Sequence, residues 1–96
     1  MSNVESLRSE IDQLHEELHA ILERRRALTE AIWDIKTSEG MPLYCPERED
    51  ALIKKFSEMG EGQSSPQVKE LNAAIMSALL KEYRRYLESK YSHPKA

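Results

Sequence analysis

Residues 4–37 read VESLRSEIDQLHEELHAILERRRALTEAIWDIKT and include neither glycine nor proline. Apolar side chains recur there every three or four positions, which is the spacing of a single helical face. This face, called the seam below, consists of Val4, Leu7, Ile11, Leu14, Leu18, Ile21, Leu28, Ile32 and Ile35. The stretch therefore predicts one long amphipathic helix with the apolar row of a coiled coil.

Gly40 and Pro42 predict the end of this first helix. Glycine readily adopts the left-handed conformation that terminates a helix, whereas proline cannot continue one. Pro46 then fits the first turn of a second helix. We expect that helix to run over about 46–59, with an apolar stripe along one side.

Ser65 and Pro66 predict the start of a third helix, because serine caps a helix N-terminus and proline fits its first turn. The helical apolar spacing continues to about residue 91, and residues 92–96 form a polar tail. No stretch alternates in the manner of a strand. The predicted fold class is all-α, with a long, a short and a long helix in a single domain over 1–96.

The overall composition argues against several classes of protein. The 96 residues suffice for about one domain, which leaves no room for separate cofactor and substrate domains. Fourteen Lys and Arg against seventeen Asp and Glu give a formal charge of −3, without the basic excess of nucleic-acid-binding proteins. The single cysteine, Cys45, cannot form an internal disulfide. No apolar run has the length of a membrane span, and the start resembles no secretory signal, so we expect a cytoplasmic protein.

The length of the first helix predicts an assembly. A helix of about 33 residues is about 50 Å long, whereas a compact chain of this size has a radius of gyration of about 12 Å. The two companion helices of the same chain cannot cover such a helix. A second copy must bury the rest of the seam, so we expect an intertwined, antiparallel homodimer.

Arg25 occupies the position of the seam between Ile21 and Leu28. A guanidinium in line with leucine and isoleucine is unfavourable unless an anion meets it. One interpretation is a carboxylate of a bound ligand. The other is structural, with a glutamate of a neighbouring helix pairing with Arg25 and fixing the register.

Lys36 and Arg8 are the next candidates. Lys36 lies about three turns beyond Arg25 on the same side, some 16 Å along the axis, so two long side chains could grip one small dianion. In an antiparallel dimer, Arg8 of the other protomer would arrive between Arg25 and Lys36. Taken alone, Lys36 is also compatible with a solvated residue at the negative end of a helix, and Arg8 with a surface cation.

Arg48 and Glu49 lie in the first turn of the second helix, where a glutamate can simply complement the helix dipole and an arginine form a surface ion pair. His15 and His19 share a helical face, but no third ligand is in register, so we expect no metal site. Cys45 has no histidine at a recognisable spacing, which argues against a catalytic thiolate.

Several fragments carry a more specific pattern through their order and spacing. They are Leu7-Arg8-x-x-Ile11-Asp12, Leu22-x-x-Arg25-x-x-Leu28, Ile32-x-x-x-Lys36, Pro42-Leu43-Tyr44-x-Pro46-x-Arg48-Glu49, and Val68-x-x-Leu71-x-x-x-Ile75-Met76. Together they resemble the all-helical chorismate mutases, the AroQ class. The resemblance covers roughly residues 4 to 57 and continues into the third helix.

The resemblance implies an intertwined three-helix dimer with two equivalent active sites and a small dianionic substrate. Carried over, Arg8 from the second chain and Arg25 bind carboxylates. Lys36 binds a carboxylate and the ether oxygen of chorismate. Arg48 supports this network, and Glu49 accepts a hydrogen bond from the ring hydroxyl.

The implied reaction is the rearrangement of chorismate to prephenate in the shikimate pathway of aromatic amino-acid biosynthesis. This step is unimolecular and pericyclic, so it requires no nucleophile, metal or cofactor. The enzyme must hold the enolpyruvyl arm over the ring in a near-attack geometry. It must also place positive charge where negative charge grows on the breaking ether bond.

The third helix departs from the family pattern. The family usually has a glutamine or glutamate on the ether oxygen, whereas an ungapped alignment places Tyr83 there, with Glu82 adjacent. A phenol can donate a hydrogen bond, so we take Tyr83 as the third catalytic candidate. The departure keeps open a related enzyme acting on 4-amino-4-deoxychorismate or isochorismate. The structural interpretation of Arg25 keeps open a second alternative, a non-catalytic helical dimerisation module.

Overall fold

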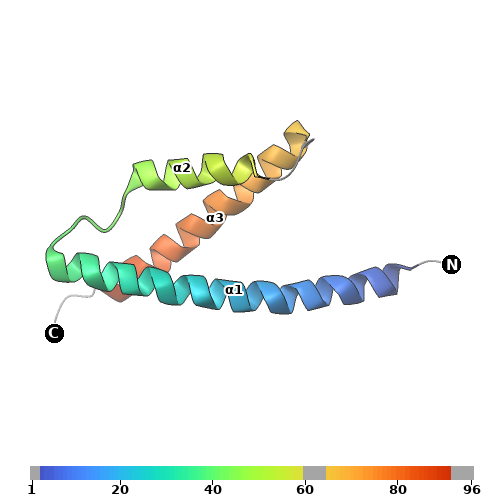
Figure 1. Ribbon diagram of the computed structural model, residues 1–96, viewed down its shortest axis with the longest axis horizontal. Helices are drawn as coiled ribbons and strands as arrows, with labels where there is room; N and C mark the ends of the chain where they lie inside the picture. Colours follow the sequence, from blue (N-terminus) through green and yellow to red (C-terminus); the bar gives the residue numbers. More distant parts are fainter. Residues whose placement is uncertain (1–2, 60–64, 92–96) are drawn as a thin grey trace. The chain divides into compact units, whose positions relative to one another are not determined.

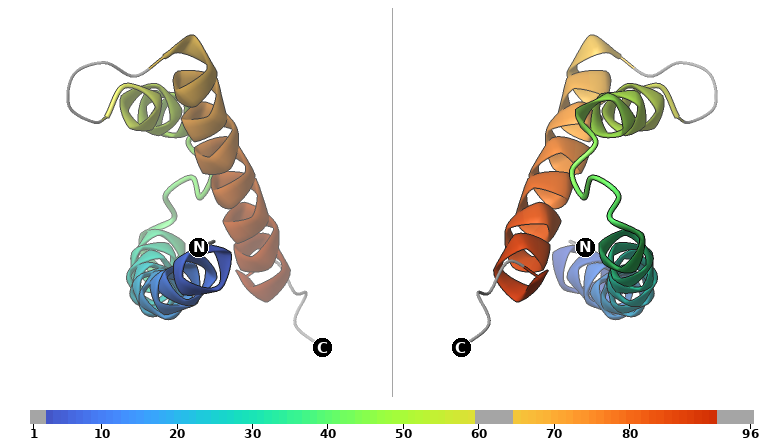
Figure 2. Two further views of the ribbon diagram at one scale, coloured as in Figure 1. Left: turned by 90° about the vertical axis from the view of Figure 1, so that its right-hand side faces the viewer. Right: turned by 90° about the vertical axis from the view of Figure 1, so that its left-hand side faces the viewer.

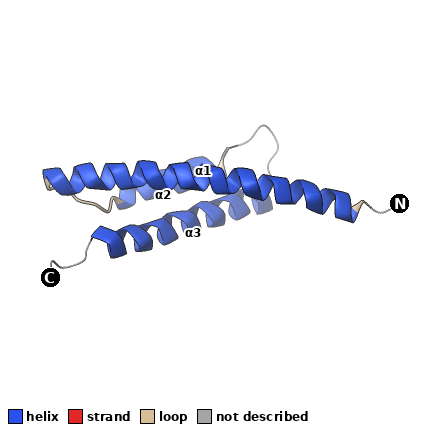
Figure 3. Ribbon diagram, turned by 90° about the horizontal axis from the view of Figure 1, so that it is seen from below, coloured by secondary structure: helices blue, strands red, loops and turns tan. Residues whose placement is uncertain are grey.

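The computed structural model describes residues 3–59 and 65–91 of the chain. These residues form the helices α1 (Val4–Glu39), α2 (Pro46–Ser57) and α3 (Pro66–Tyr91), and none of them lies in a strand (Figures 1 and 3). The predicted all-α class and the long, short, long order are confirmed. The polar tail, residues 92–96, lies outside the described residues.

The chain divides into two compact units. The first, Met1–Ile35, contains most of α1, and the second, Lys36–Ala96, contains the last turn of α1, the connection to α2, and both shorter helices. In the second unit, α2 packs against α3 (Figure 2). The first turn of α2 and the C-terminal part of α3 meet there through an ion pair between Glu49 and Arg84.

The end of α1 is set by Gly40, as the sequence predicts. Gly40 has a φ of 70°, in the left-handed region. Its N–H donates to the carbonyl of Thr37 at 3.3 Å, and the N–H of Met41 donates to the carbonyl of Lys36 at 2.8 Å. This pair of bonds is a Schellman motif. It lets the helix continue to Glu39, two residues beyond the predicted end at 37.

Local hydrogen bonds also set the ends of the shorter helices. The Ser65 hydroxyl accepts a hydrogen bond from the N–H of Val68 at 3.2 Å, which confirms the predicted cap of α3. Helix α2 ends at Ser57 rather than at the predicted residue 59. There the N–H of Glu58 is shared between the carbonyls of Lys54 and Lys55, both at 3.2 Å, and this tightened last turn closes the helix.

One chain leaves most of its apolar pattern in contact with water. Among the described residues, the buried apolar side chains are Trp33, Leu80 and Leu87. Every seam residue is between 47% and 65% exposed. The described helices include none with the length and apolar character that crossing a membrane requires. The seam is thus a continuous apolar row on α1 that a single copy does not cover.

Candidate active site

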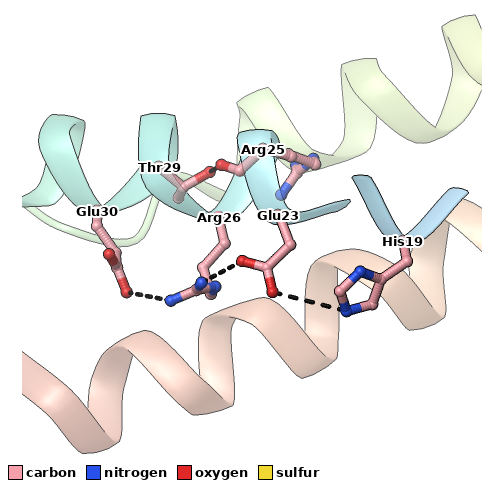
Figure 4. Close-up of polar contacts among 6 residues, drawn as sticks. All are labelled: His19, Glu23, Arg25, Arg26, Thr29 and Glu30. Atoms are coloured by element: carbon pink, nitrogen blue, oxygen red, sulfur yellow. Dashed lines mark hydrogen bonds and ion pairs between the residues drawn. The ribbon is translucent and has the colours of Figure 1, made fainter. Parts of the chain in front are cut away.

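Arg25 lies in the middle of α1 and is half-buried. One turn later, the Thr29 hydroxyl donates a hydrogen bond to the Arg25 carbonyl at 2.7 Å. Figure 4 shows the Arg25 side chain directed away from the row of ionic side chains on the same helix. The side chain of Arg25 is therefore presented on a different part of the α1 surface from that row.

The ionic row consists of His19, Glu23, Arg26 and Glu30 (Figure 4). Arg26 forms an ion pair with Glu23 and a second one with Glu30 at 3.6 Å. His19 lies 3.6 Å from Glu23. The hydrogen bond from Arg26, together with its charge, lowers the pKa of the Glu23 carboxyl. Such partly exposed pairs at helical spacing support α1 only modestly.

Lys36 lies in the last turn of α1, where its side chain is half-buried. Its Nζ donates to the carbonyl of Leu43 in the connection to α2, at a distance of 3.4 Å. This hydrogen bond is long, and an ammonium carries three donors. Lys36 therefore keeps the capacity to bind an anion while it rests against the connection.

Glu49 is half-buried in the first turn of α2, and its Oε1 accepts a hydrogen bond from Nη1 of Arg84 in α3 at 2.5 Å. The side chains of Arg84 and Glu49 are 25% and 21% exposed. The Arg84 guanidinium also lies over the ring of Tyr44, with its Cζ 4.4 Å from the ring centroid. One guanidinium thus ties the α1–α2 connection and the start of α2 to α3.

Sequence reasoning did not identify Arg84. The hydrogen bond to Glu49 raises the pKa of the Arg84 guanidinium, so its charge is permanent at every physiological pH. One signal could have indicated it: two helices joined by a short connection run antiparallel. The acidic start of α2 then lies near the end of α3, where Arg84 and Arg85 are the basic residues that follow Tyr83.

Arg8 and Arg48 are both exposed, the first near the start of α1 and the second in the first turn of α2. Seventeen residues of one helix separate Arg8 from Arg25, which corresponds to about 25 Å along the axis. Arg8 and Arg25 of one chain therefore do not meet on α1.

Among residues 3–59 and 65–91, no three His, Cys, Asp or Glu side chains gather in a way that could hold a metal ion.

The two third-helix candidates have different surroundings. Tyr83 is half-buried in α3. Glu82 is exposed and forms an ion pair with Arg85 at 3.0 Å, one turn along the same helix. Glu82 therefore lies on the solvated side of α3, whereas Tyr83 lies on its more enclosed side.

Comparison with known protein families identifies the family to which this chain belongs. The family described as chorismate mutase type II matches residues 7–86, which is more than half of the chain. The chain belongs to the chorismate mutase type II family. The matched segment of this family member contains every predicted site residue, and it also contains Arg84.

Two curated relatives match part of this chorismate mutase type II chain. A bifunctional chorismate mutase/prephenate dehydratase of Aquifex aeolicus is 36% identical over 56 residues, which is 58% of this chain and 16% of the relative. A T-protein of Haemophilus influenzae is 39% identical over 54 residues, which is 56% of this chain and 14% of the relative. The chain spans a small part of the length of both proteins. No solved structure matches it.

Proposed function

We propose that this chain catalyses the rearrangement of chorismate to prephenate, in the cytoplasm, as a cofactor-independent step of aromatic amino-acid biosynthesis. The observation that carries the proposal is the family match over residues 7–86. The matched range contains Arg8, Arg25, Lys36 and Arg48, the cationic residues that the sequence pattern singles out. The geometry of the second unit supports it, since Glu49 and Lys36 are both half-buried beside the α1–α2 connection.

The proposed mechanism uses positive charge and shape. Arg25 and the Arg8 of a second copy hold the two carboxylates, so that the enolpyruvyl arm is folded over the ring. Lys36 donates to the ether oxygen, whose negative charge grows as the carbon–oxygen bond breaks. Arg48 lies beside this network and adds positive charge on the substrate side. Glu49 orients the ring through its hydroxyl.

The site we propose is complete only in a homodimer. Arg8 and Arg25 of one chain are too far apart on α1 to share a small ligand, so the second carboxylate needs Arg8 of the partner subunit. The exposed seam supports this assembly, because a row of half-exposed leucine and isoleucine side chains is unstable in water. In an antiparallel pair, the two seams cover each other and bring each Arg8 toward the other chain's site.

For the third-helix contact to the ether oxygen we propose Tyr83 rather than Glu82. The support is burial: Tyr83 is half-buried, whereas the Glu82 side chain is 63% exposed and already paired with Arg85. A phenol hydroxyl also donates a hydrogen bond directly. The developing negative charge on the ether oxygen favours such a donor.

The direct test is an assay of the pure chain with chorismate. We expect prephenate to form at a rate far above the uncatalysed background, without added metal or cofactor. Parallel incubations with 4-amino-4-deoxychorismate and isochorismate identify the preferred substrate. A rate equal to background with chorismate, and turnover of one of the other two compounds, would replace the proposed reaction by that one.

A further inference from the structure

Arg84 makes a contact that the proposed mechanism does not use. Its guanidinium hydrogen-bonds to Oε1 of Glu49 at 2.5 Å and covers the Tyr44 ring at 4.4 Å from the centroid. Glu49 is the residue that we propose meets the ring hydroxyl. Arg84 therefore contacts Glu49, the residue that we propose recognises the ring hydroxyl of the substrate.

The planar shape of arginine suits both contacts. A guanidinium presents donors in a fixed plane, and its face stacks on an aromatic ring. With its Cζ over the Tyr44 ring and its Nη1 hydrogen-bonded to Glu49, Arg84 restricts the orientation of the carboxylate. A carboxylate has acceptor capacity on both oxygens, so the ion pair through Oε1 leaves room for one further donor.

The charge of Arg84 determines which donor is favoured. A lone carboxylate attracts an ammonium more strongly than a hydroxyl. With Arg84 beside it, the carboxylate is already neutralised, and a second cation within about 5 Å of the guanidinium is repelled. A neutral hydroxyl avoids this repulsion and still donates a hydrogen bond to Glu49.

We propose that Arg84 is a positioning and specificity-determining residue, which orients Glu49 and makes this subsite favour a ring hydroxyl over a ring ammonium. The inference rests on the proposed function, because it takes Glu49 as the partner of the ring hydroxyl. The preferred substrate is then the compound that carries a hydroxyl, rather than an ammonium, at the ring position that Glu49 contacts. The amino analogue is disfavoured by charge rather than by size.

The test compares chorismate with 4-amino-4-deoxychorismate, whose aliphatic amine is protonated at pH 7. For each variant we would measure KM and kcat for chorismate, and the inhibition constant of the amino compound against chorismate. In Arg84→Gln we expect the ratio of inhibition constant to KM to fall by about tenfold or more. The matched control is Arg85→Gln, which removes the adjacent, exposed arginine of the same helix and leaves the ratio unchanged.

A second pair of variants separates charge from orientation. Arg84→Lys keeps a cation but loses the guanidinium contact over the Tyr44 ring, so we expect the preference for chorismate to persist while kcat/KM falls about tenfold. Arg84→Met covers the Tyr44 ring without a charge, and we expect it to lose the preference like Arg84→Gln. Arg84→Met replaces Arg84→Gln in the test if the glutamine variant does not fold.

The outcomes distinguish this inference from the proposed function. Wild-type protein that forms no prephenate overturns the proposed function. Active wild-type protein, with the same ratio of constants in a folded Arg84→Gln or Arg84→Met variant, overturns the inference alone. A parallel loss of binding for both compounds also overturns it, because that result assigns Arg84 a purely structural role.

Discussion

At the scale of single residues, the clearest contrast is between neighbouring arginines on α1. Arg26 is engaged with Glu23 and Glu30 on the ionic row, whereas Arg25 is half-buried and directed elsewhere (Figure 4). One residue along a helix corresponds to a rotation of about 100°. Adjacent residues with the same side chain therefore have different roles, one in supporting the helix and the other in the proposed anion site.

Replacing Arg25 tests that division. In Arg25→Ala we expect the dimer to persist but kcat/KM to fall at least about a hundredfold, because a charge-assisted contact to a carboxylate is lost. Calorimetry with a bicyclic analogue of the transition state should show the matching loss of affinity. Arg24→Ala, which removes the exposed arginine one position earlier, should stay within about twofold of wild type.

The same variant decides between enzyme and structural module. A non-catalytic dimerisation module has no ligand affinity to lose, so the wild-type chain itself would give no calorimetric signal. If the dimer dissociates in Arg25→Ala, Arg25 acts in register and assembly rather than in anion binding. Size-exclusion chromatography beside the calorimetry reports this outcome.

At the scale of elements, helix order and the breaks between helices could be predicted because local residues determine them. Gly40 and Ser65 act through bonds to residues within a few positions, and the structure confirms both. The approximate predicted ends of α1 and α2 differ by two residues from the observed ones, because the pattern does not show how the last carbonyls are satisfied. The Glu49–Arg84 pair joins residues 35 positions apart, and its formation depends on how α2 packs on α3.

Variants of Tyr83 and Glu82 test which face of α3 contacts the substrate. In Tyr83→Phe we expect kcat to fall about tenfold to a hundredfold with little change in KM, because the lost hydrogen bond strengthens only in the transition state. Steady-state kinetics measures the split. In Glu82→Gln both constants should stay near wild type, since only an exposed ion pair is lost; the reverse pattern would assign the contact to Glu82.

At the scale of the whole molecule, the sequence predicted an apolar seam on α1 that the rest of one chain does not bury. The seam residues are about half exposed, while few apolar side chains are buried among the described residues. The mismatch between helix length and chain size already indicated this. Stability of the fold is then expected to come largely from contacts between copies.

A charge in the seam tests the assembly. Leu14, which is 57% exposed in one chain, lies in the part of the seam that the expected antiparallel pairing covers. In Leu14→Lys we expect loss of the dimer and of most helical structure, because a buried ammonium without a partner is strongly unfavourable. Analytical ultracentrifugation and circular dichroism measure both. Gln13→Lys, on an exposed non-seam position, is the control, and a monomeric wild-type protein would refute the assembly outright.

Few apolar side chains are enclosed among the described residues of one copy, and this has a consequence for enzymology. When folding and pairing are one event, the folded fraction depends on protein concentration. The specific activity would then drop upon dilution below the dissociation constant of the dimer. The midpoint of thermal unfolding would rise with protein concentration. A cell that makes little of this polypeptide would hold most of it as unpaired, protease-sensitive chains, so its metabolic output would rise more steeply than its synthesis.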